Sequence, residues 1–374
     1  MKLTPFKLER YYSQYEFSAK HSICNSDCEA MTIGELLLME EGSEEAFHNH
    51  WLGYTETEGH PNLRKEIASI YETIFSNNLL VCTGAQEPIY LFSLSNLEAG
   101  DEVIVQTPCY ESLHSIPIGK ACHVKKWEVQ YSDDGPSFSL DELADLITNQ
   151  TKVIFLNSPH NPTGYHFSKQ EQQDIVNLAR KHGCIIFCDE VYRELELDPS
   201  YRIPAFADIY ENGVSIGVMS KSYGLPGLRI GWVATKNKTI LEKIAILKEY
   251  TTICNSAPSE FLAEVALRNR GKILDKNLAI VKQNKLLYDK FFSLHEDLFS
   301  WFPPKAGPIS FVKMKTDTDD KSFAERALNE KQLLILPGWI YDFPGFFRVG
   351  MGRTQIPESL AIFSQFVEES LLQV

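Results

Sequence analysis

A lysine that follows an apolar run is the residue of this sequence with the clearest chemical potential. Residues 214–219 are mostly apolar and lead directly into Ser220 and Lys221. A lysine beside a buried strand is costly as an ammonium ion, because desolvation favours the neutral amine. The neutral amine is the form that condenses with aldehydes, so this position predicts covalent catalysis by Lys221.

A carboxylate occupies the corresponding place after another apolar run. Residues 184–188 lead directly into Asp189, and Asp189 is followed by Glu190, Val191 and Tyr192. A carboxylate at the end of a buried strand must be desolvated and therefore needs a cationic or N–H partner. An aspartate that only caps the next helix would explain the position equally well, so both interpretations stay open here.

Two glycine-containing turns also follow apolar runs. Residues 79–83 lead into 84–86, where a helix is expected to begin, and such a turn offers backbone N–H groups to an anion. Most turns of this kind bind nothing. Residues 153–157 are followed by the Asn-Pro-Thr-Gly sequence of 161–164, for which a tight turn alone explains three of the four residues.

In order and spacing, three motifs resemble the class I and II aminotransferases, which are pyridoxal-phosphate (PLP) enzymes of fold type I. The motifs are Asn161-Pro-Thr-Gly164, Asp189-Glu-Val-Tyr192, and Ser220-Lys221 followed by Pro226-Gly-Leu-Arg-Ile-Gly-Trp232. The similarity extends from about residue 51 to residue 353. The resemblance implies PLP as cofactor and transfer of an amino group from an L-amino acid to a 2-oxo acid.

The resemblance also implies a role for each residue around the cofactor ring. Lys221 would carry PLP as a Schiff base, the internal aldimine, and would act as general base toward the substrate. Asp189 would keep the ring nitrogen protonated. Tyr192 and Asn161 would bind the phenolic oxygen of the ring, and Tyr110 would stack on its face.

A second set of residues would surround the cofactor phosphate, with an arginine as the cationic clamp. Three residues before the lysine the family has Ser or Thr, whereas this chain has Val218. We expect Ser220 or Ser222 to supply the missing hydrogen bond, or the affinity for PLP to be lower. The residues implied at the phosphate are Gly84, Ala85, Gln86, Ser220 and Arg229.

Substrate and partner residues follow from the same resemblance. Arg348 matches the arginine that pairs with the substrate α-carboxylate, beside Asn161, although a surface arginine after a strand is the alternative. Tyr54 matches the tyrosine that reaches the phosphate of the neighbouring subunit, which implies a homodimer. No second arginine matches the one used for dicarboxylic substrates, and this disfavours aspartate and glutamate as donors. The substrate side chain is expected to meet residues 23–32, Tyr15, Phe17 and the loop near Trp51 of a neighbouring subunit.

Two other functions fit the same residues. PLP-dependent lyases and cyclases begin with the same removal of an α-proton, and residues 6–10 and 15–17 are similar to capreomycidine-synthase-like enzymes, which cyclise an arginine derivative. A non-catalytic dimeric descendant is the other possibility. The presence of Lys221, Asp189 and Arg229 disfavours it.

These residues require a sheet whose strands end at one edge. Short runs rich in Val and Ile alternate with helix-period segments up to residue 239, which is typical of a mostly parallel sheet flanked by helices. Ligands bind at the carboxyl edge of such sheets. The expected strands are residues 79–83, 102–106, 153–157, 185–189, 214–219 and 229–234, and the expected helices are residues 87–97, 110–119, 140–147 and 169–182.

Beyond residue 239 the pattern changes to long amphipathic stretches. We therefore predict an α/β protein with a large PLP-binding domain, residues 46–255, and a smaller α+β domain formed by residues 1–45 and 256–374. The first 45 residues are expected to contain one helical stretch, residues 32–39. We expect helices at 240–247 and 256–295, and, in the smaller domain, strands at 309–313, 333–337 and 346–350 and a last helix after Pro357.

Composition excludes several classes of function. At 374 residues the chain is too long for one simple core, and its net charge of -14 without a Lys/Arg run excludes nucleic acid and anionic membranes as partners. No secretory signal and no stretch near ~20 apolar residues is visible, so we expect a cytoplasmic protein. Cys24 and Cys28 lack a second Cys/His pair with zinc spacing, so no metal is expected.

Overall fold

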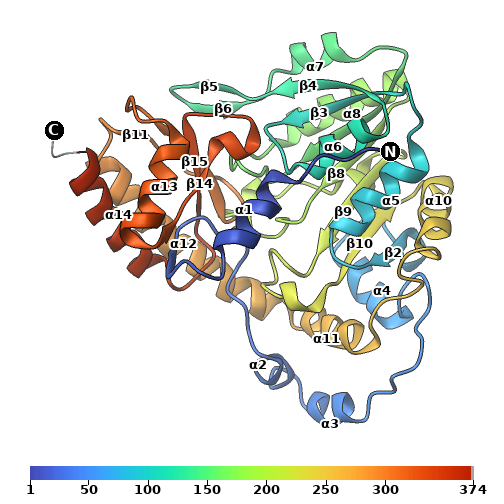
Figure 1. Cartoon of the computed structure of the whole chain (residues 1–374). Coiled ribbons are helices and arrows are strands. Elements are labelled where there is room, and N and C mark those ends of the chain that lie inside the picture. Colours follow the sequence, from blue (N-terminus) through green and yellow to red (C-terminus); the bar gives the residue numbers. More distant parts are fainter. Residues whose placement is uncertain (372–374) are drawn as a thin grey trace.

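The computed structural model describes residues 1–371, and a seven-stranded sheet forms the centre of its larger part (Figure 1). The strand order is β2-β10-β9-β8-β7-β3-β4, in which only β10 runs antiparallel to its neighbours. The predicted α/β fold with a mostly parallel sheet is therefore confirmed. The strands are β2 (Leu79–Cys82), β3 (Glu102–Thr107), β4 (His123–Glu128), β7 (Thr151–Asn157), β8 (Ile185–Asp189), β9 (Gly213–Val218) and β10 (Gly231–Thr235).

Helices cover both faces of this sheet. In β7, Val153 and Phe155 pack in one apolar cluster with residues of α5 and α10, whereas Ile154 and Leu156 pack in another with residues of α8. This alternation follows from the two-residue period of a strand, and burial on both faces explains the continuous apolar runs. The flanking helices are α5 (Gln86–Asn96), α6 (Ser112–Gly119), α7 (Leu140–Leu146), α8 (Lys169–His182) and α10 (Lys238–Lys248).

Three features of the larger part differ from the expectations. The edge strand β4 was not predicted, because only Trp127 of its six residues is buried. A hairpin of β5 (Gln130–Ser132) and β6 (Gly135–Ser137) extends from it. The predicted strand at 229–234 begins two residues later, because Arg229 adopts a left-handed backbone conformation with φ of 53°.

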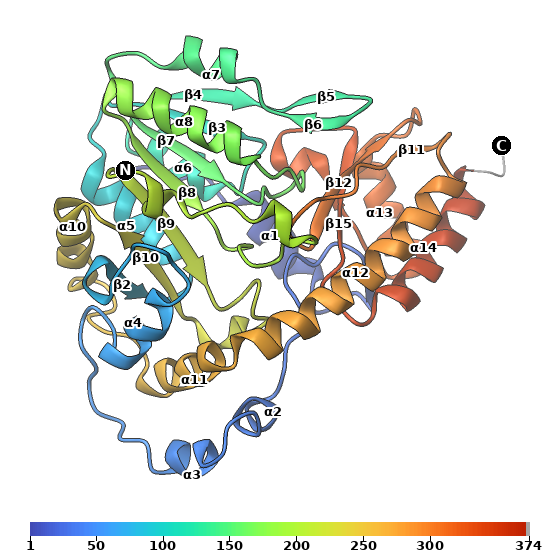
Figure 2. The ribbon, with the colours of Figure 1, turned by 180° about the vertical axis from the view of Figure 1, so that it is seen from behind.

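The smaller part is built on a four-stranded antiparallel sheet in the order β11-β12-β15-β14. Its strands are β11 (Phe299–Ser300), β12 (Ile309–Met314), β14 (Leu336–Pro337) and β15 (Phe346–Gly350). Figure 2 views the molecule from behind and shows α12 running from α11 toward α14. The helices of this part are α12 (Arg270–Leu294), α13 (Asp320–Lys331) and α14 (Ile356–Leu371), whereas α11 (Ala257–Arg268), which precedes them, packs mainly on α4 (Pro61–Ala68) and α2 (Ile33–Leu37).

The single helix predicted at 256–295 is wrong, because the chain breaks at Asn269 into α11 and α12. The predicted strand at 333–337 is likewise divided. Its first half, β13 (Leu333–Leu334), pairs in parallel with β1 (His21–Ser22), whereas its second half is β14. The N-terminal segment is thus attached to the smaller part by a strand pair.

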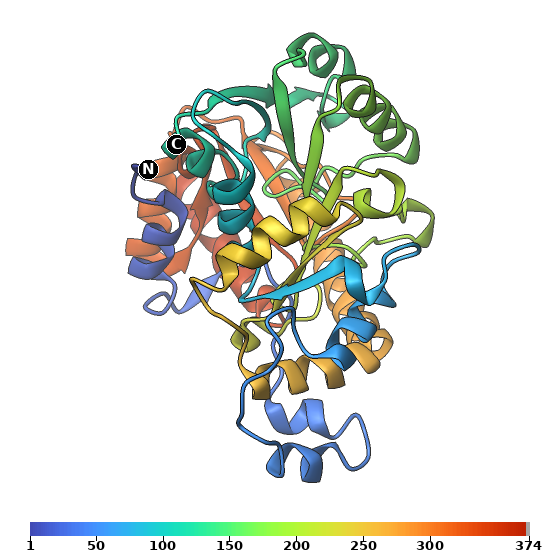
Figure 3. The ribbon, with the colours of Figure 1, turned by 90° about the vertical axis from the view of Figure 1, so that its right-hand side faces the viewer.

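The N-terminal 45 residues contain more helix than expected. Besides α2 (Ile33–Leu37), they form α1 (Lys7–Tyr15) and the start of α3 (Ser43–His48), so the expectation of one helical stretch is wrong. α1 packs Leu8, Tyr11, Tyr12 and Tyr15 in one apolar cluster, and their helical spacing was not recognised in the sequence. α2 and α3 pack on α11 at one end of the molecule, at the bottom of Figure 3. The domain boundaries at 46 and 255 stay a prediction.

Two further observations complete the fold. Helix α4 (Pro61–Ala68) packs on α11 beside β2. None of the helices within residues 1–371 combines the length and the apolar composition needed to cross a membrane.

Candidate active site

Most of the predicted polar side chains, which follow the carboxyl ends of the strands, line one cavity of about 390 Å³. Asp189 is the last residue of β8, and Ser220 and Lys221 follow β9. α1 and the segment at 25–27 form the opposite wall. The predicted site residues that line this cavity are Ala85, Gln86, Tyr110, Asn161, Asp189, Tyr192, Ser220, Lys221, Arg229 and Arg348.

Lys221 lies at the centre of this arrangement. Its Nζ donates a hydrogen bond to Ser26 Oγ at 2.9 Å. Burial lowers the pKa of the Lys221 ammonium, although the negative charge of Asp27 opposes this shift. The neutral amine of Lys221 is therefore favoured in this cavity relative to water. A neutral amine is the property that the sequence predicted for this lysine.

Asp189 is 5% exposed, and within residues 1–371 its carboxylate receives one hydrogen bond, from the backbone N–H of Val191 to Oδ1 at 3.1 Å. Burial raises the pKa of Asp189 to about 6. The interpretation as a helix cap is wrong, because a turn and not a helix follows β8. No side chain among residues 1–371 donates to this carboxylate, so its chemistry fits a cationic N–H of a bound group.

Tyr192 provides the clearest sign that the cavity accepts a polar ligand. The side chain is 1% exposed, and its hydroxyl has no hydrogen-bond partner within residues 1–371. A buried hydroxyl without a partner is destabilising unless a ligand satisfies it. Asn161 Oδ1 accepts from Arg348 Nη1 at 3.0 Å, which leaves its amide N–H groups free to donate. Both residues therefore fit the phenolic oxygen of PLP.

The start of α5 forms an anion site beside Arg229. No side chain caps this helix at Ala85, so its first backbone N–H groups remain available. Gly84 has φ of +69°, and a Cβ at this position would lie 2.5 Å from Arg229 Nη2. Gly84 is thus tightly packed against the guanidinium although it does not line the cavity. A phosphate group fits the N–H groups and the guanidinium together.

Ser220 and Val218 flank this anion site. Ser220 Oγ accepts from Arg229 Nη1 at 3.5 Å, and Ser220 lines the cavity. Val218 is 3% exposed and ends β9 at the cavity wall. Ser222 instead donates to the backbone carbonyls of Val191 and Arg193, which leaves Ser220 as the hydroxyl available at this wall.

Arg348 is 1% exposed, so the interpretation as a surface arginine is wrong. Within residues 1–371 its guanidinium donates only to neutral acceptors, which are Asn161 Oδ1, the carbonyl of Cys24, and the hydroxyls of Tyr12 and Tyr341. A buried guanidinium without an anionic partner is costly. The cavity therefore offers a site for a carboxylate at this end.

Tyr110 and Tyr54 occupy different environments. Tyr110 lines the cavity, and its hydroxyl donates to Glu9 Oε1 at 2.9 Å. Tyr54 is 85% exposed and lies outside the cavity of its own chain. This exposure leaves Tyr54 available to a neighbouring molecule.

Several residues of the cavity were not predicted individually. Asn25, Ser26 and Asp27 lie in the segment that the sequence assigned to the substrate pocket. Glu9, Tyr12 and Glu16 come from α1 and its C-terminal end, where the helical spacing of the apolar residues was the available sequence signal. Tyr15 and Phe17, which were expected at the substrate, do not line this cavity.

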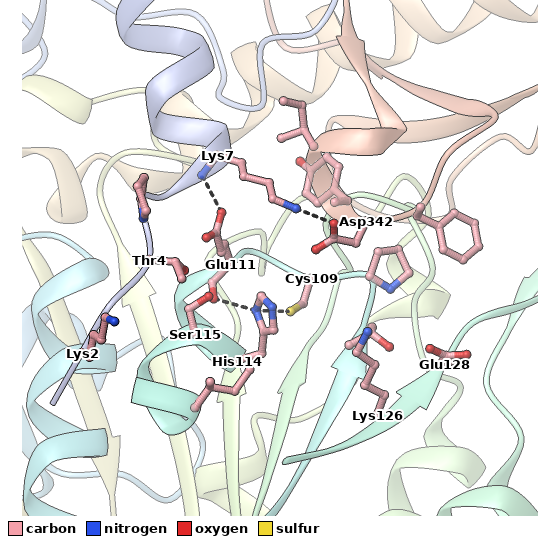
Figure 4. Close-up of a pocket in the computed structure, with 17 residues that line it drawn as sticks. Lys2, Thr4, Lys7, Cys109, Glu111, His114, Ser115, Lys126, Glu128 and Asp342 are labelled. Atoms are coloured by element: carbon pink, nitrogen blue, oxygen red, sulfur yellow. Dashed lines mark hydrogen bonds and ion pairs between the residues drawn. The ribbon is translucent and has the colours of Figure 1, made fainter. Parts of the chain in front are cut away.

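A second hollow of about 430 Å³ contains a cysteine and a histidine (Figure 4). Cys109 Sγ lies 3.9 Å from His114 Nδ1, but that nitrogen is also 2.8 Å from the carbonyl oxygen of Glu111. Burial raises the pKa of Cys109 to about 12 and lowers the pKa of His114. These shifts oppose a thiolate–imidazolium pair, so this hollow is not a cysteine-nucleophile site.

Comparison with known proteins agrees with the geometry. The family model for aminotransferase class I and II matches residues 35–358. Capreomycidine synthase of Streptomyces vinaceus is 25% identical over 96% of this chain and 92% of its own length. Other relatives carry the names of aspartate and kynurenine aminotransferases.

Two solved structures are similar over nearly the whole chain. A PLP-dependent aminotransferase from Streptococcus suis has a TM-score of 0.93 and 30% identity, and covers 99% of each chain. The PLP-dependent cyclase OrfR has a TM-score of 0.90 and 26% identity, over 99% of this chain and 98% of its own. The chain therefore belongs to the class I and II aminotransferase family, has PLP fold type I, and uses PLP as its cofactor.

Proposed function

We propose that this enzyme is an aminotransferase that moves an amino group from an L-amino acid to a 2-oxo acid. The observation that carries the proposal is the placement of Lys221, Asp189 and the buried Arg348 around one cavity. An amine, an acid and a carboxylate site are the groups that amino-acid chemistry on PLP requires.

Each end of the cavity would hold one part of the reactants. The turn at 84–86, Ser220 and Arg229 would bind the phosphate, and Asn161 and Tyr192 would bind the phenolic oxygen. Arg348 would bind the substrate α-carboxylate through two N–H groups. When bound, PLP supplies an electron sink for charge that develops at the substrate α-carbon.

Proton transfer would depend on two residues. Lys221 Nζ would accept the α-proton as general base, and the hydrogen bond to Ser26 would orient it. Asp189 would remain ionised while a cationic N–H lies against it, because the opposite charge lowers its pKa from the value that burial imposes.

The proposal includes a homodimer in which Tyr54 completes the partner's site. The support is a run of exposed large apolar side chains: Trp51 is 78% exposed, Leu52 79% and Tyr54 85%. Such a patch is typical of an interface.

All eight cysteines are free thiols, which supports the proposed cytoplasmic location.

A cyclase or lyase is the second candidate. It is favoured by the near full-length similarity to capreomycidine synthase and to OrfR, which is described as a PLP-dependent cyclase. It would use the same α-proton removal but would need no 2-oxo acid. Release of ammonia or a cyclic product without an acceptor would identify it.

Steady-state kinetics with an amino donor and a 2-oxo acid test the proposal. We expect parallel double-reciprocal lines, since the donor's product leaves before the acceptor binds. Lys221→Ala should abolish turnover and the visible cofactor absorbance, whereas the exposed control Lys243→Ala should change neither. Intersecting lines, or product formation without the acceptor, would contradict transamination.

A further inference from the structure

One side of the cavity carries an excess of negative charge. Glu9, Glu16 and Asp27 line it, from α1, the end of α1 and the segment at 25–27. The cavity is a ligand site on independent grounds, because the 1% exposed Tyr192 presents a hydroxyl without a partner to it.

The cations of the protein neutralise only one of these acids. Arg353 forms an ion pair with Asp27, with Nη2 2.7 Å from Oδ2 and Nε 3.1 Å from Oδ1. Glu9 accepts only the hydroxyl of Tyr110, and within residues 1–371 the Glu16 carboxylate has neither an ion pair nor a hydrogen bond. Two carboxylates at the cavity thus form no ion pair within residues 1–371, although Lys221 lines the same cavity.

The three acids are close enough to repel one another. Burial raises the pKa of Glu16, and the charges of Asp27 and Glu9 raise this pKa further, against the opposing effects of Arg353 and Lys221. A cation placed among these carboxylates would relieve their repulsion. An anionic group placed there would add to it.

The position of Arg348 orients a substrate toward these acids. Arg348 Nη2 contacts the hydroxyl of Tyr12. Tyr12 lies three residues after Glu9 and four residues before Glu16, so the three side chains share one face of α1. An amino acid held by its α-carboxylate at Arg348 therefore extends its side chain along a helix face that carries two free carboxylates.

We propose that the amino donor is an amino acid whose side chain ends in an ammonium or guanidinium group, bound by Glu9 and Glu16. This inference rests on the proposed function and names its substrate class. The acids select for positive charge at the side-chain end, whereas Arg348 holds the end common to all amino acids.

Single-turnover kinetics of the holoenzyme test the inference. L-lysine and L-norleucine have similar size and differ in the terminal charge, and L-arginine and L-glutamate extend the series. We expect kcat/KM for lysine and arginine to exceed that for norleucine by about tenfold or more, which corresponds to about 1.4 kcal/mol or more. Glutamate should be the poorest donor.

Charge-neutralising variants locate the effect. Glu9→Gln and Glu16→Gln should each lower kcat/KM for the cationic donors by about fivefold, the upper range for an exposed ion pair, and leave norleucine unchanged. The exposed control Glu41→Gln should change no donor. Preference for norleucine, or equal losses for charged and neutral donors, would overturn the inference while leaving transamination intact.

A binding measurement separates this inference from the proposed function. If no amino acid reacts, transamination fails, and the affinity of the Lys221→Ala protein for arginine and norleucine can still be measured by calorimetry. Tighter binding of arginine, lost in Glu16→Gln, would support the inference. Equal affinities for the two amino acids would overturn it.

Discussion

Lys221 Nζ lies 2.9 Å from Ser26 Oγ, although 195 positions separate these residues in the chain. The contact joins the end of β9 to the segment that follows β1. This segment lies against the lysine in a second way, because the backbone N–H of Cys28 donates to the carbonyl of Lys221 at 3.4 Å. The N-terminal segment is therefore one wall of the site.

Ser26→Ala should slow the reaction of the holoenzyme with its amino donor by about 2- to 13-fold, the equivalent of one ordinary hydrogen bond. Ser26 Oγ accepts this hydrogen bond directly from Lys221 Nζ. The affinity for PLP should change little. Stopped-flow absorbance gives the rate, and the exposed Ser13→Ala is the control. An unchanged rate would show that Ser26 does not orient the lysine.

Asp189→Asn should stabilise the apoprotein above pH 6. The folded pKa of Asp189 is about 6, above the ordinary value of 3.8, so the native state binds more protons than the unfolded state between these pH values. The contribution of Asp189 to the free energy of unfolding therefore falls as the pH rises from about 4 to 6. Above pH 6 this contribution is about 3 kcal/mol lower than it is below pH 4. Asparagine has no charge to desolvate.

Denaturant unfolding of the apoprotein at pH 4 and pH 8 checks this sign. The difference in the free energy of unfolding between Asp189→Asn and the natural protein should be near zero at pH 4 and favour the variant at pH 8. The holoenzyme should respond in the opposite way if Asp189 pairs with the ring nitrogen as proposed, because asparagine cannot form that ion pair. Lower stability of the variant apoprotein at pH 8 would contradict the burial argument.

Elements with strong apolar periods and clear end signals were predictable. The expected residues 185–189 and 346–350 coincide with β8 and β15, and residues 169–182 coincide with α8. α8 begins at a capping box formed by Ser168 and Glu171 and ends at Gly183, so its limits are encoded locally. The residues at the carboxyl ends of these strands meet as expected.

The N-terminal wall of the site could not be predicted in the same way. α1 buries only Leu8, and its place depends on contacts with residues around 338–341. β1 has only two residues and pairs with Leu333 and Leu334. Contacts between such distant positions leave no local pattern. The segment that contains Ser26 was expected at the substrate, but its contact with Lys221 and the position of the acids of α1 required the structure.

Val218→Ser should tighten the binding of PLP by about tenfold, the lower range for a hydrogen bond to a charged group. Val218 ends β9 at the cavity wall and is 3% exposed, so an added hydroxyl would be desolvated and directed toward the phosphate site. Val218→Thr is the matched variant, because it adds the hydroxyl while keeping the branched shape. An unchanged or larger dissociation constant in a titration of the apoprotein would contradict this prediction.

Arg348→Lys should lower kcat/KM for all α-amino acids by about 10- to 150-fold, since a lysine cannot form two parallel hydrogen bonds to a carboxylate. The ratio between cationic and neutral donors should stay the same, because Arg348 contacts the end that all donors share. Donor-series kinetics on the variant measure both quantities. A changed ratio would place Arg348 at the substrate side chain instead.

Tyr54→Phe should impair the partner's site and not its own. Tyr54 is 85% exposed and lies outside its own cavity, so its hydroxyl can reach a phosphate only in a second molecule. When Tyr54→Phe protein is mixed with an excess of inactive Lys221→Ala protein under subunit exchange, nearly every Tyr54→Phe chain pairs with an inactive chain that has an intact Tyr54. Activity per Tyr54→Phe chain should then rise toward that of a natural site, because each two-fold dimer has one complete site. Activity that stays at the level of the Tyr54→Phe homodimer would mean that this tyrosine acts within its own chain or not at all.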